Sequence, residues 1–204
     1  MKLYNSVGPN PHVVRMFAAE VGVDLPLEDI DILGGANRQA DYLEINQSGQ
    51  LPCLELADGQ RIAEITAICE YLDEISPSAS LIGATPEERA NSRMWTRRVD
   101  LNICEPLANG FRYAEGLPIF RDRMITIPQA ADDLKRIARE KLAWLDSLMS
   151  DGRPFIAGEK ITLADVLLFC LLVFGNETGQ PLDENLAHVK PWFDRMAARP
   201  SASA

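Results

Sequence analysis

The sequence predicts an α/β domain built on a mixed four-stranded sheet, followed by an all-helical domain. Over the first 75 or so residues, strand-like segments alternate with segments of helical periodicity in the order β-α-β-α-β-β-α. A strand–helix–strand unit predicts two parallel strands, and the Asp58-Gly59 turn between two short strands predicts an antiparallel hairpin. From about residue 85 onward every periodic segment is helical. We therefore expect a first domain over residues 1–77, a linker over 78–84 and a helical domain over 85–204.

The first domain is expected to contain four strands and three helices. Residues 1–5 form the first strand. The first helix covers residues 12–22, because apolar side chains recur at helical spacing from Val13 to Val21 and the run closes on Gly22. The later elements follow at residues 25–32 (strand), 40–46 (helix), 53–56 (strand), 61–63 (strand) and 64–75 (helix).

The second domain is expected to contain only helices. Thr85 is a typical N-cap residue, and it precedes Pro86 and two glutamates, which favour a helix start. Thr162 and Asp165 have the spacing of a capping box at the start of another helix. The predicted helical segments are residues 85–114, 128–152, 162–175 and 188–200.

Composition and charge exclude several classes of protein. Hydrophobic residues make up 47% of the 204 positions and charged residues 25%, as in ordinary globular proteins. The net charge of −10 without a basic stripe argues against nucleic-acid binding. No apolar run approaches the roughly 20 residues of a membrane-spanning helix. The N-terminal residues lack the features of a secretory signal, so we expect a cytoplasmic protein.

The cysteines and histidines do not indicate a metal site. Cysteines stand at positions 53, 69, 104 and 170, without the short spacings typical of metal ligands. The two histidines, His12 and His188, are far apart in the chain. We therefore expect neither a disulfide framework nor a bound metal, and we expect the cysteines to act as small apolar side chains.

Pro52 opens the third predicted strand, ahead of the alternating Leu54 and Leu56. Proline has no N–H for a sheet ladder, so it occurs in strands only at edges, at the first residue or at bulges. The start of this strand therefore needs an explanation beyond sheet pairing.

Three separated motifs resemble the glutathione transferase superfamily. NQSGQLPCLELADGQRIAEITAICEYLDE (residues 46–74) resembles the pattern N-P-x-G-x-V-P-x-L-x-x-x-D-G-x-x-L-x-E-S-x-A-I-x-x-Y-L. FIAGEKITLADVLLF (155–169) is similar to the family's second-domain capping signature, and PWFDRMAARPSA (191–202) to its usual C-terminus. Together they cover nearly the whole chain and are closest to the yeast-type branch common in bacteria. The resemblance implies a thioredoxin-like first domain.

The resemblance also implies where glutathione binds. The Leu51–Pro52 bond is expected to be cis, with the N–H and C=O of Leu51 pairing with the cysteinyl part of glutathione, next to Gln50. Glu64 is expected to hold the γ-glutamyl ammonium group. Ile65 replaces the usual serine, so its backbone N–H and the positive helix end remain for the γ-glutamyl carboxylate.

The group that activates the glutathione thiol is left open by the sequence. In the loop NSVGPNPHV, the family's serine position falls on Gly8 and its cysteine position on Asn10. Asn10 can donate an amide N–H to a thiolate at the positive end of a helix. Ser6 is a second candidate, His12 a third because imidazole can act as a base at neutral pH, and backbone amides alone a fourth.

The second substrate is expected to be a small electrophile bound by the helical domain. Tyr113, where the related branch often has histidine, is a candidate for this electrophile site, as is His12. Asp100 is a candidate to reach glutathione across a homodimer. The function expected from the resemblance is conjugation of glutathione, as co-substrate, to the electrophile. Two alternatives stay open: glutathione-dependent reduction of disulfides or peroxides, and a non-catalytic binding module of the same fold.

Overall fold

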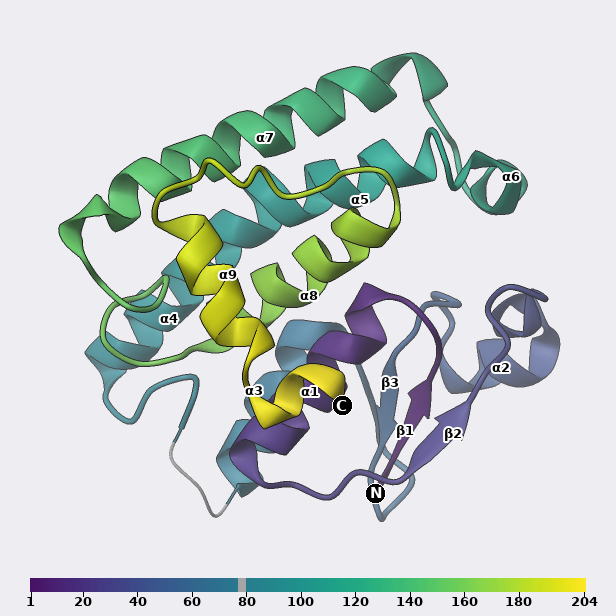
Figure 1. The fold of residues 1–204 in the computed structure, drawn as a ribbon. Helices are drawn as coiled ribbons and strands as arrows, with labels where there is room; N and C mark the ends of the chain where they lie inside the picture. Colours follow the sequence, from purple (N-terminus) through teal and green to yellow (C-terminus); the bar gives the residue numbers. More distant parts are fainter. Residues whose placement is uncertain (77–79) are drawn as a thin grey trace. The chain divides into compact units, whose positions relative to one another are not determined.

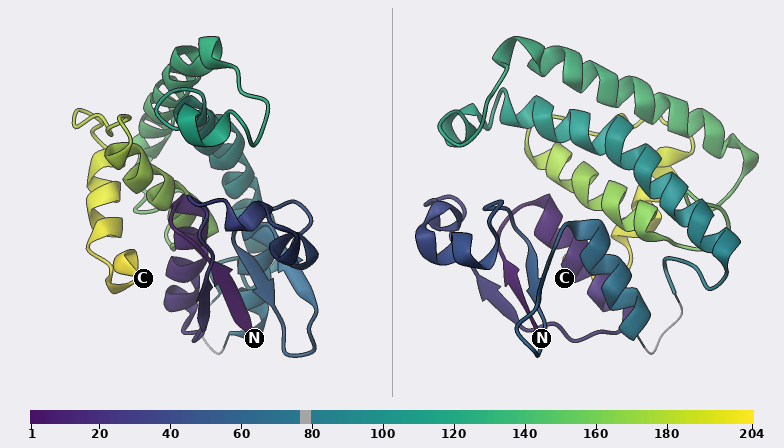
Figure 2. Two further views of the ribbon diagram at one scale, coloured as in Figure 1. Left: turned by 90° about the vertical axis from the view of Figure 1, so that its right-hand side faces the viewer. Right: turned by 180° about the vertical axis from the view of Figure 1, so that it is seen from behind.

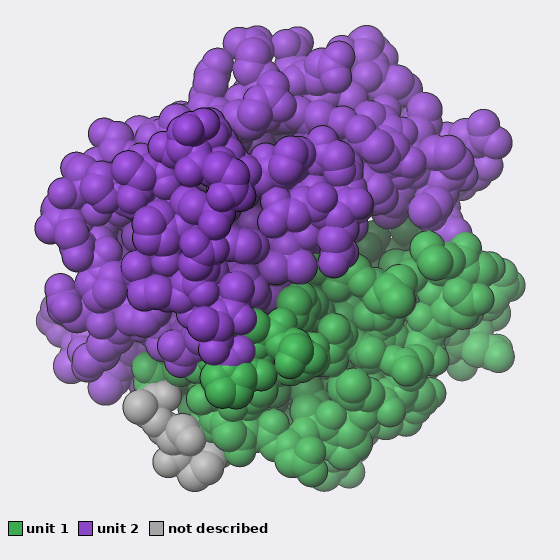
Figure 3. Space-filling view, in the orientation of Figure 1, with its two compact units in different colours: residues 1–82, 200–204 green, residues 83–199 purple. Residues whose placement is uncertain are grey.

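The computed structural model describes residues 1–76 and 80–204 and divides into two compact units, which Figure 3 colours separately. Unit 1 comprises Met1–Ile82 and Pro200–Ala204, and unit 2 comprises Gly83–Arg199. The division falls within the predicted linker, of which residues 78 and 79, like residue 77 before it, lie outside the described residues. The last five residues belong to unit 1, whereas the sequence placed them in the helical domain.

Unit 1 is built on a mixed sheet with the strand order β2-β1-β3-β4. β1 pairs with β2 in parallel, and the other two pairs are antiparallel. The strands are β1 (Lys2–Asn5), β2 (Leu27–Asp29), β3 (Cys53–Glu55) and β4 (Arg61–Ala63). The helices are α1 (Pro9–Val21), the short 3-10 helix η1 (Ala36–Arg38), α2 (Ala40–Ile45) and α3 (Ile65–Ile75). The predicted order of elements and the mixed four-stranded sheet are confirmed.

Helices cover both faces of this sheet (Figures 1 and 2). α1 and α3 pack against each other, and the buried side chains of α1 recur at helical spacing, as the sequence predicted. Neighbouring residues of a strand point to opposite faces. Leu3 is fully buried, and Tyr4 joins a separate apolar cluster that contains Tyr42 of α2, Leu51 and Cys53. The segment before Pro52 is therefore packed between the sheet and α2.

Unit 2 is a bundle of helices, of which α8 is buried from Leu163 to Leu172. α8 packs against α4, α5 and α9. A helix that is apolar on all sides is expected in such a central position. The helices are α4 (Pro86–Val99), α5 (Glu105–Arg112), α6 (Leu117–Phe120), α7 (Ala131–Leu148), α8 (Leu163–Glu177) and α9 (Val189–Ala197), with short 3-10 helices η3 (Pro128–Ala130), η4 (Met149–Asp151) and, in unit 1, η5 (Pro200–Ser203).

The predicted capping box at the start of α8 is present. The carboxylate of Asp165 accepts hydrogen bonds from the backbone N–H of Thr162 at 2.8 Å and of Ile156 at 2.8 Å. It also accepts one from the indole N–H of Trp192 in α9 at 2.9 Å. Burial raises the pKa of Asp165, and these hydrogen bonds oppose that rise. One acidic side chain thus joins the start of α8 to α9 and to the preceding loop.

The helix predicted over residues 85–114 is interrupted by a π-helical turn, Asp100–Cys104, between α4 and α5. The backbone N–H of Glu105 donates to the carbonyl of Asp100, five residues earlier. Pro106 explains the interruption, because it has no N–H and its ring clashes with the carbonyl four residues before it. A wider turn just ahead of Pro106 relieves that clash, and the helix continues as α5.

Candidate functional site

Three chain segments meet at one edge of the sheet in unit 1. The register pairs Tyr4 of β1 with Cys53 of β3, and Cys53 with Ala63 of β4. Because β3 runs against both neighbours, β3 begins at the edge where β1 and β4 end. α1 follows β1 and α3 follows β4, so both helices also start at this edge. The predicted glutathione-binding and thiol-site residues of the first domain are therefore brought together by the topology.

Leu51 lies at this edge, immediately before β3. Its peptide bond to Pro52 is cis, as the resemblance implied. Neither the N–H nor the C=O of Leu51 forms a hydrogen bond with any residue in the described ranges, although its side chain is buried. Buried backbone groups are nearly always paired. A peptide main chain alongside Leu51 could pair with both groups.

The residues that hold this segment in place were missed in the sequence. The hydroxyl of Tyr42 donates to the carbonyl of Gln50 at 2.7 Å, and the side-chain amide of Asn46 donates to the same oxygen at 2.9 Å. Burial raises the pKa of Tyr42, so its hydroxyl stays protonated as a donor. The side chain of Gln50 is exposed. Asn46 is the first residue of the family pattern, and this was the available signal that it helps to hold the segment before Pro52.

Glu64 marks the start of α3 and has an unusual backbone conformation. Its φ of 69° and ψ of 122° make it the one described non-glycine residue with positive φ. Such conformations cost roughly 1–3 kcal/mol and often occur at ligand sites. The side chain of Glu64 is exposed and has no hydrogen-bond or ion-pair partner among the described residues.

The first turn of α3 has backbone donors available for an anion. The first intrahelical donor is the N–H of Ile68, which bonds to the carbonyl of Glu64 at 2.9 Å. The N–H groups of Ile65 and Thr66 precede it, and no described residue accepts from them. These donors and the helix dipole favour a carboxylate at this point. A site that can bind a carboxylate thus lies directly beside the carboxylate of Glu64, which can bind an ammonium group. Together they suit the α-carboxylate and α-ammonium groups of a free amino acid.

The first turn of α1 offers donors from one residue, Asn10. Gly8 is the N-cap, with φ of 112°, and Pro9 and Pro11 have no N–H. The backbone N–H and the side-chain amide of Asn10 have no partner among the described residues. The hydroxyl of Ser6, which is buried at 6% exposure, likewise makes no hydrogen bond there. The arrangement at α1 can hold one anionic atom.

Comparisons with known proteins agree with this geometry. Residues 7–75 match the family model of the glutathione S-transferase N-terminal domain, and residues 115–200 match that of the C-terminal domain. The chain belongs to the glutathione S-transferase superfamily. Its predicted membership is confirmed.

Three relatives of this transferase-family chain cover most of its length. The crystal structure of a glutathione S-transferase domain-containing protein from Marinobacter aquaeolei is 34% identical with a TM-score of 0.93, covering 99% of this chain and all of the other. Gtt2 from Saccharomyces cerevisiae is 28% identical with a TM-score of 0.92, covering 100% of this chain and 99% of the other. A glutathione S-transferase from Pseudomonas putida is 32% identical over 85% of this chain and 73% of its own length. The similarity to Gtt2 confirms the predicted resemblance to the yeast-type branch of the superfamily.

His12 in this transferase-family chain makes a structural contact. It lies in α1, one turn after the N-terminus, and its Nε2 is 3.0 Å from the carbonyl oxygen of Ala202. The sequence made His12 a candidate base and a candidate for the electrophile site. One of its two ring nitrogens is engaged in this contact, and both roles remain predictions.

Tyr113 and Asp100 both belong to unit 2. Tyr113 is half-buried and caps the end of α5, where its backbone N–H donates to the carbonyl of Asn109 at 3.0 Å. Asp100 opens the π-helical turn, and its Oδ2 lies 3.9 Å from Nη1 of Arg97. Their suggested roles in electrophile binding and across a dimer remain predictions.

The four cysteines are buried and unbridged, as expected of small apolar side chains. Burial raises the pKa of Cys53, which follows Pro52, so its thiol is poorly suited to act as a nucleophile. Among the described residues, we find no group of three or more acidic, cysteine or histidine side chains that could hold a metal ion. In the same part of the chain, no helix has the length and apolar character needed to cross a membrane.

Proposed function

We propose that this protein is a glutathione transferase that joins the sulfur of glutathione to a small electrophile. The observation that carries the proposal is the convergence, at one sheet edge, of the backbone of Leu51, the carboxylate of Glu64 and the N-termini of α1 and α3. Within the described part of the chain, neither the backbone of Leu51 nor the carboxylate of Glu64 has a partner. Family membership supports the same conclusion.

The groups at this edge match the parts of glutathione in order. The γ-glutamyl carboxylate would accept from the N–H groups of Ile65 and Thr66, and the adjacent ammonium would pair with Glu64. The cysteinyl main chain would bond to the N–H and C=O of Leu51, beside the exposed Gln50. Ile65 provides no hydroxyl, so this carboxylate has one donor fewer than in the usual family pattern, a difference of about 1.5–3 kcal/mol for a charged group.

Asn10 is the residue that we propose to stabilise the thiolate. The net charge of the protein is −10, so its overall field disfavours a further anion, and local donors must lower the pKa of the thiol. The amide N–H groups of Asn10 and the positive end of α1 supply that effect. The thiol releases its proton to solvent, sulfur forms a bond to the electrophilic carbon, and the leaving group departs with its electron pair.

Substitution of Asn10 tests this mechanism. We expect Asn10→Ala to lower kcat/KM for a chloronitroaromatic substrate roughly 10- to 100-fold, as for loss of a hydrogen bond to a charged group. The pH at which half-maximal kcat/KM is reached should rise, because the bound thiol ionises less easily. Ser6→Ala is the matched control and should change neither quantity. Equal effects of both substitutions, or no shift in the pH profile, would contradict the role of Asn10.

A second candidate function is glutathione-dependent reduction of disulfides or peroxides, which a thiolate stabilised by Asn10 also suits. Activity with hydroxyethyl disulfide, compared with activity on the chloronitroaromatic, separates the two reactions. Retention on immobilised glutathione without activity in either assay would indicate a non-catalytic binding module. Calorimetry that registers no binding of glutathione to the folded protein would exclude all three.

We also propose that the protein acts as a cytoplasmic homodimer. Four buried, unbridged cysteines suit a reducing compartment. Met94 and Leu101 are 40% and 47% exposed, and a spacing of seven residues places them on one face of the α4 region, near Asp100. We expect light scattering to give the mass of a dimer and Leu101→Glu to shift it towards the monomer. A monomeric wild-type protein would contradict both the dimer and a role of Asp100 across it.

A further inference from the structure

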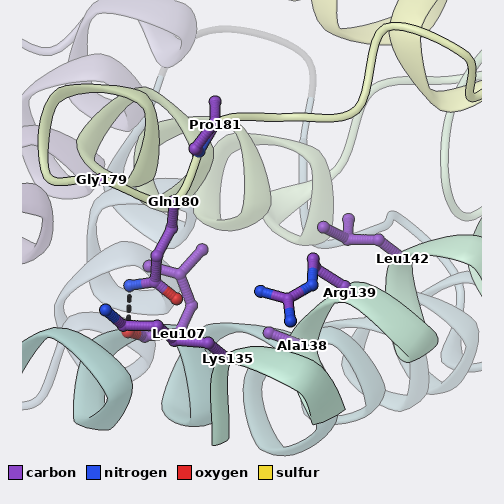
Figure 4. Close-up of a pocket in the computed structure, with 8 residues that line it drawn as sticks. All are labelled: Leu107, Lys135, Ala138, Arg139, Leu142, Gly179, Gln180 and Pro181. Atoms are coloured by element: carbon purple, nitrogen blue, oxygen red, sulfur yellow. Dashed lines mark hydrogen bonds between the residues drawn. The ribbon is translucent and has the colours of Figure 1, made fainter. Parts of the chain in front are cut away.

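A hollow of about 220 Å³ lies within unit 2 (Figure 4). It opens between α5, α7 and the loop that follows α8. Its lining residues are Leu107 from α5, Lys135, Ala138, Arg139 and Leu142 from α7, and Gly179, Gln180 and Pro181 from the loop. None of the residues used in the proposed transferase mechanism lines it.

Hydrogen bonds fix the loop that forms one wall of the hollow. The side-chain amide of Gln180 donates to the carbonyl of Leu107 at 2.9 Å, and its backbone N–H donates to the carbonyl of Gly175 at 2.8 Å. A Cβ at Gly175 would lie 3.0 Å from the carbonyl oxygen of Gln180 and 3.1 Å from Cδ1 of Leu107. Glycine at this position therefore allows the loop and α5 to approach α8 closely.

The two charged side chains that line the hollow, Lys135 and Arg139, are both cations, although the protein is acidic overall. Among the described residues no acidic side chain lines the hollow, and Glu115 lies next to Lys135. Lys135 donates to Glu115 at 2.5 Å, so its charge is balanced. Arg139 has no hydrogen-bond or ion-pair partner among the described residues. By contrast Arg136, on the same helix, contacts Asp133 at 3.0 Å and Glu140 at 3.4 Å.

The other side chains give the hollow an apolar wall beside this cation. Leu107, Ala138 and Leu142 are buried, and Pro181 of the loop joins them in the lining. Figure 4 shows the guanidinium of Arg139 and the amide of Gln180 extending into the space between α7 and the loop. Pockets for drug-sized ligands have volumes of about 300–1,000 Å³, so this smaller hollow suits a single substituted ring rather than a tripeptide.

We propose that this hollow binds a small organic anion with an apolar body, such as an aromatic carboxylate. The planar guanidinium of Arg139 can hold a carboxylate through two parallel hydrogen bonds. The ring then lies against Leu107, Leu142 and Pro181. The site is independent of the proposed glutathione chemistry, because it involves unit 2 alone.

Benzoate is the probe for this site. Titration into isotope-labelled protein, followed by amide NMR shifts, should give a Kd of about 0.1–1 mM, as expected for so small a ligand. The shifts should cluster at residues 107, 135–142 and 179–181. Benzyl alcohol, which has the ring but not the charge, should bind at least about tenfold more weakly, a difference of about 1.4 kcal/mol.

The arginines of α7 provide a matched pair of variants. Arg139→Gln should weaken benzoate binding about tenfold or more. Arg136→Gln makes the same change of charge on the same helix and should leave the affinity unchanged. Shifts that cluster around Asn10, Leu51 or Glu64 instead, equal weakening by both substitutions, or no shifts at millimolar benzoate would each overturn the proposal. These outcomes do not depend on whether glutathione binds.

Discussion

His12 and Ala202 are joined by a hydrogen bond that links the first helix of the chain to its last residues, with Nε2 3.0 Å from the carbonyl oxygen. A carbonyl only accepts, so Nε2 carries the proton in this bond. The side chain of Arg15, one turn further along α1, donates to the carbonyl of Ala204 at 3.1 Å. The segment 200–204 therefore lies along the helix that begins beside Asn10 (Figure 1).

His12→Ala should destabilise unit 1 because it leaves the carbonyl of Ala202 without its donor. We expect a loss of about 0.5–1.5 kcal/mol in the free energy of unfolding, measured by chemical denaturation. His12→Gln retains an N–H donor at a similar reach and should recover much of that loss. Because His12→Gln keeps a donor for Ala202 and the proposed mechanism does not use the imidazole, we also expect kcat/KM close to the wild-type value.

Ser76→Ala is the control, because the hydroxyl of Ser76 donates to the carbonyl of Val21 at 2.6 Å, at the other end of α1. His12→Ala should also increase proteolytic cleavage near residue 200, because the C-terminal segment loses a bond to α1. The control should cost similar stability without this increase in cleavage. Cleavage there that is unchanged in His12→Ala would show that the hydrogen bond does not retain the C-terminal segment. A loss of activity in His12→Gln at full stability would show instead that the imidazole takes part in the reaction.

Glu64 combines an exposed carboxylate with a left-handed backbone, and two substitutions separate these features. Glu64→Gln keeps the backbone and removes the charge, so stability should stay the same while the Kd for glutathione rises roughly 10- to 100-fold. Glu64→Gly removes the steric cost of φ at 69° and should raise the free energy of unfolding by about 1 kcal/mol, while affinity falls. Calorimetry and denaturation measure the two effects.

The contradicting outcomes for Glu64 are distinct. An unchanged Kd in Glu64→Gln would show that the carboxylate does not pair with the ammonium of glutathione. A less stable Glu64→Gly would show that contacts of the side chain outweigh the steric cost of its backbone.

Tyr42 supports the segment before Pro52, and Tyr42→Phe keeps its ring while removing the hydroxyl. The ring contact with Tyr4, at 6.2 Å between centroids, should persist. The carbonyl of Gln50 would retain the amide of Asn46 alone, at 2.9 Å. We expect a loss of about 1 kcal/mol in stability, and weaker glutathione binding because the adjacent Leu51 is held less firmly.

Tyr71→Phe is the matched control, because the hydroxyl of Tyr71 makes no hydrogen bond within the described part of the chain. It should alter neither stability nor the affinity measured by calorimetry. An equal response of the two variants would mean that the Tyr42 hydroxyl does not position Leu51.

Local sequence signals predicted much of this structure, and long-range contacts account for the remainder. The capping residues Thr85 and Thr162 act within one helical turn, so their pattern was sufficient. The second strand was expected over residues 25–32 but covers Leu27–Asp29. This strand is the outermost strand next to β1, so it has hydrogen bonds to a neighbouring strand on one side only. All three of its residues are exposed, so little side-chain packing stabilises a longer strand.

The candidate site shows the same limit. The family motif placed Leu51, Pro52 and Glu64, because these positions lie close together in one quoted pattern. The donor from Tyr42 to Gln50 depends on how α2 packs, and the bond from His12 spans 190 residues. Neither contact has a signal in local periodicity.

Glu88 completes the capping box at the start of α4 and should make stability depend on pH. Its Oε2 accepts the backbone N–H groups of Ala84 at 2.8 Å and Thr85 at 3.2 Å. These bonds, the one from Ala84 foremost, lower the pKa of Glu88. A lowered pKa stabilises the fold above the ordinary glutamate pKa of about 4.3, and this contribution is lost as the pH falls through the folded-state value.

Glu88→Gln should therefore lower Tm at neutral pH, and the difference from wild type should shrink steadily once the pH falls below about 4. Differential scanning calorimetry across this range measures both. Glu87→Gln changes the same charge in the same turn, where the exposed Glu87 has no partner in the described ranges, and should leave Tm nearly unchanged. A difference that persists undiminished into acid would mean that the charge of Glu88 is not what stabilises the cap. An unchanged Tm at neutral pH would mean instead that hydrogen-bond geometry alone, which glutamine also provides, stabilises the start of α4.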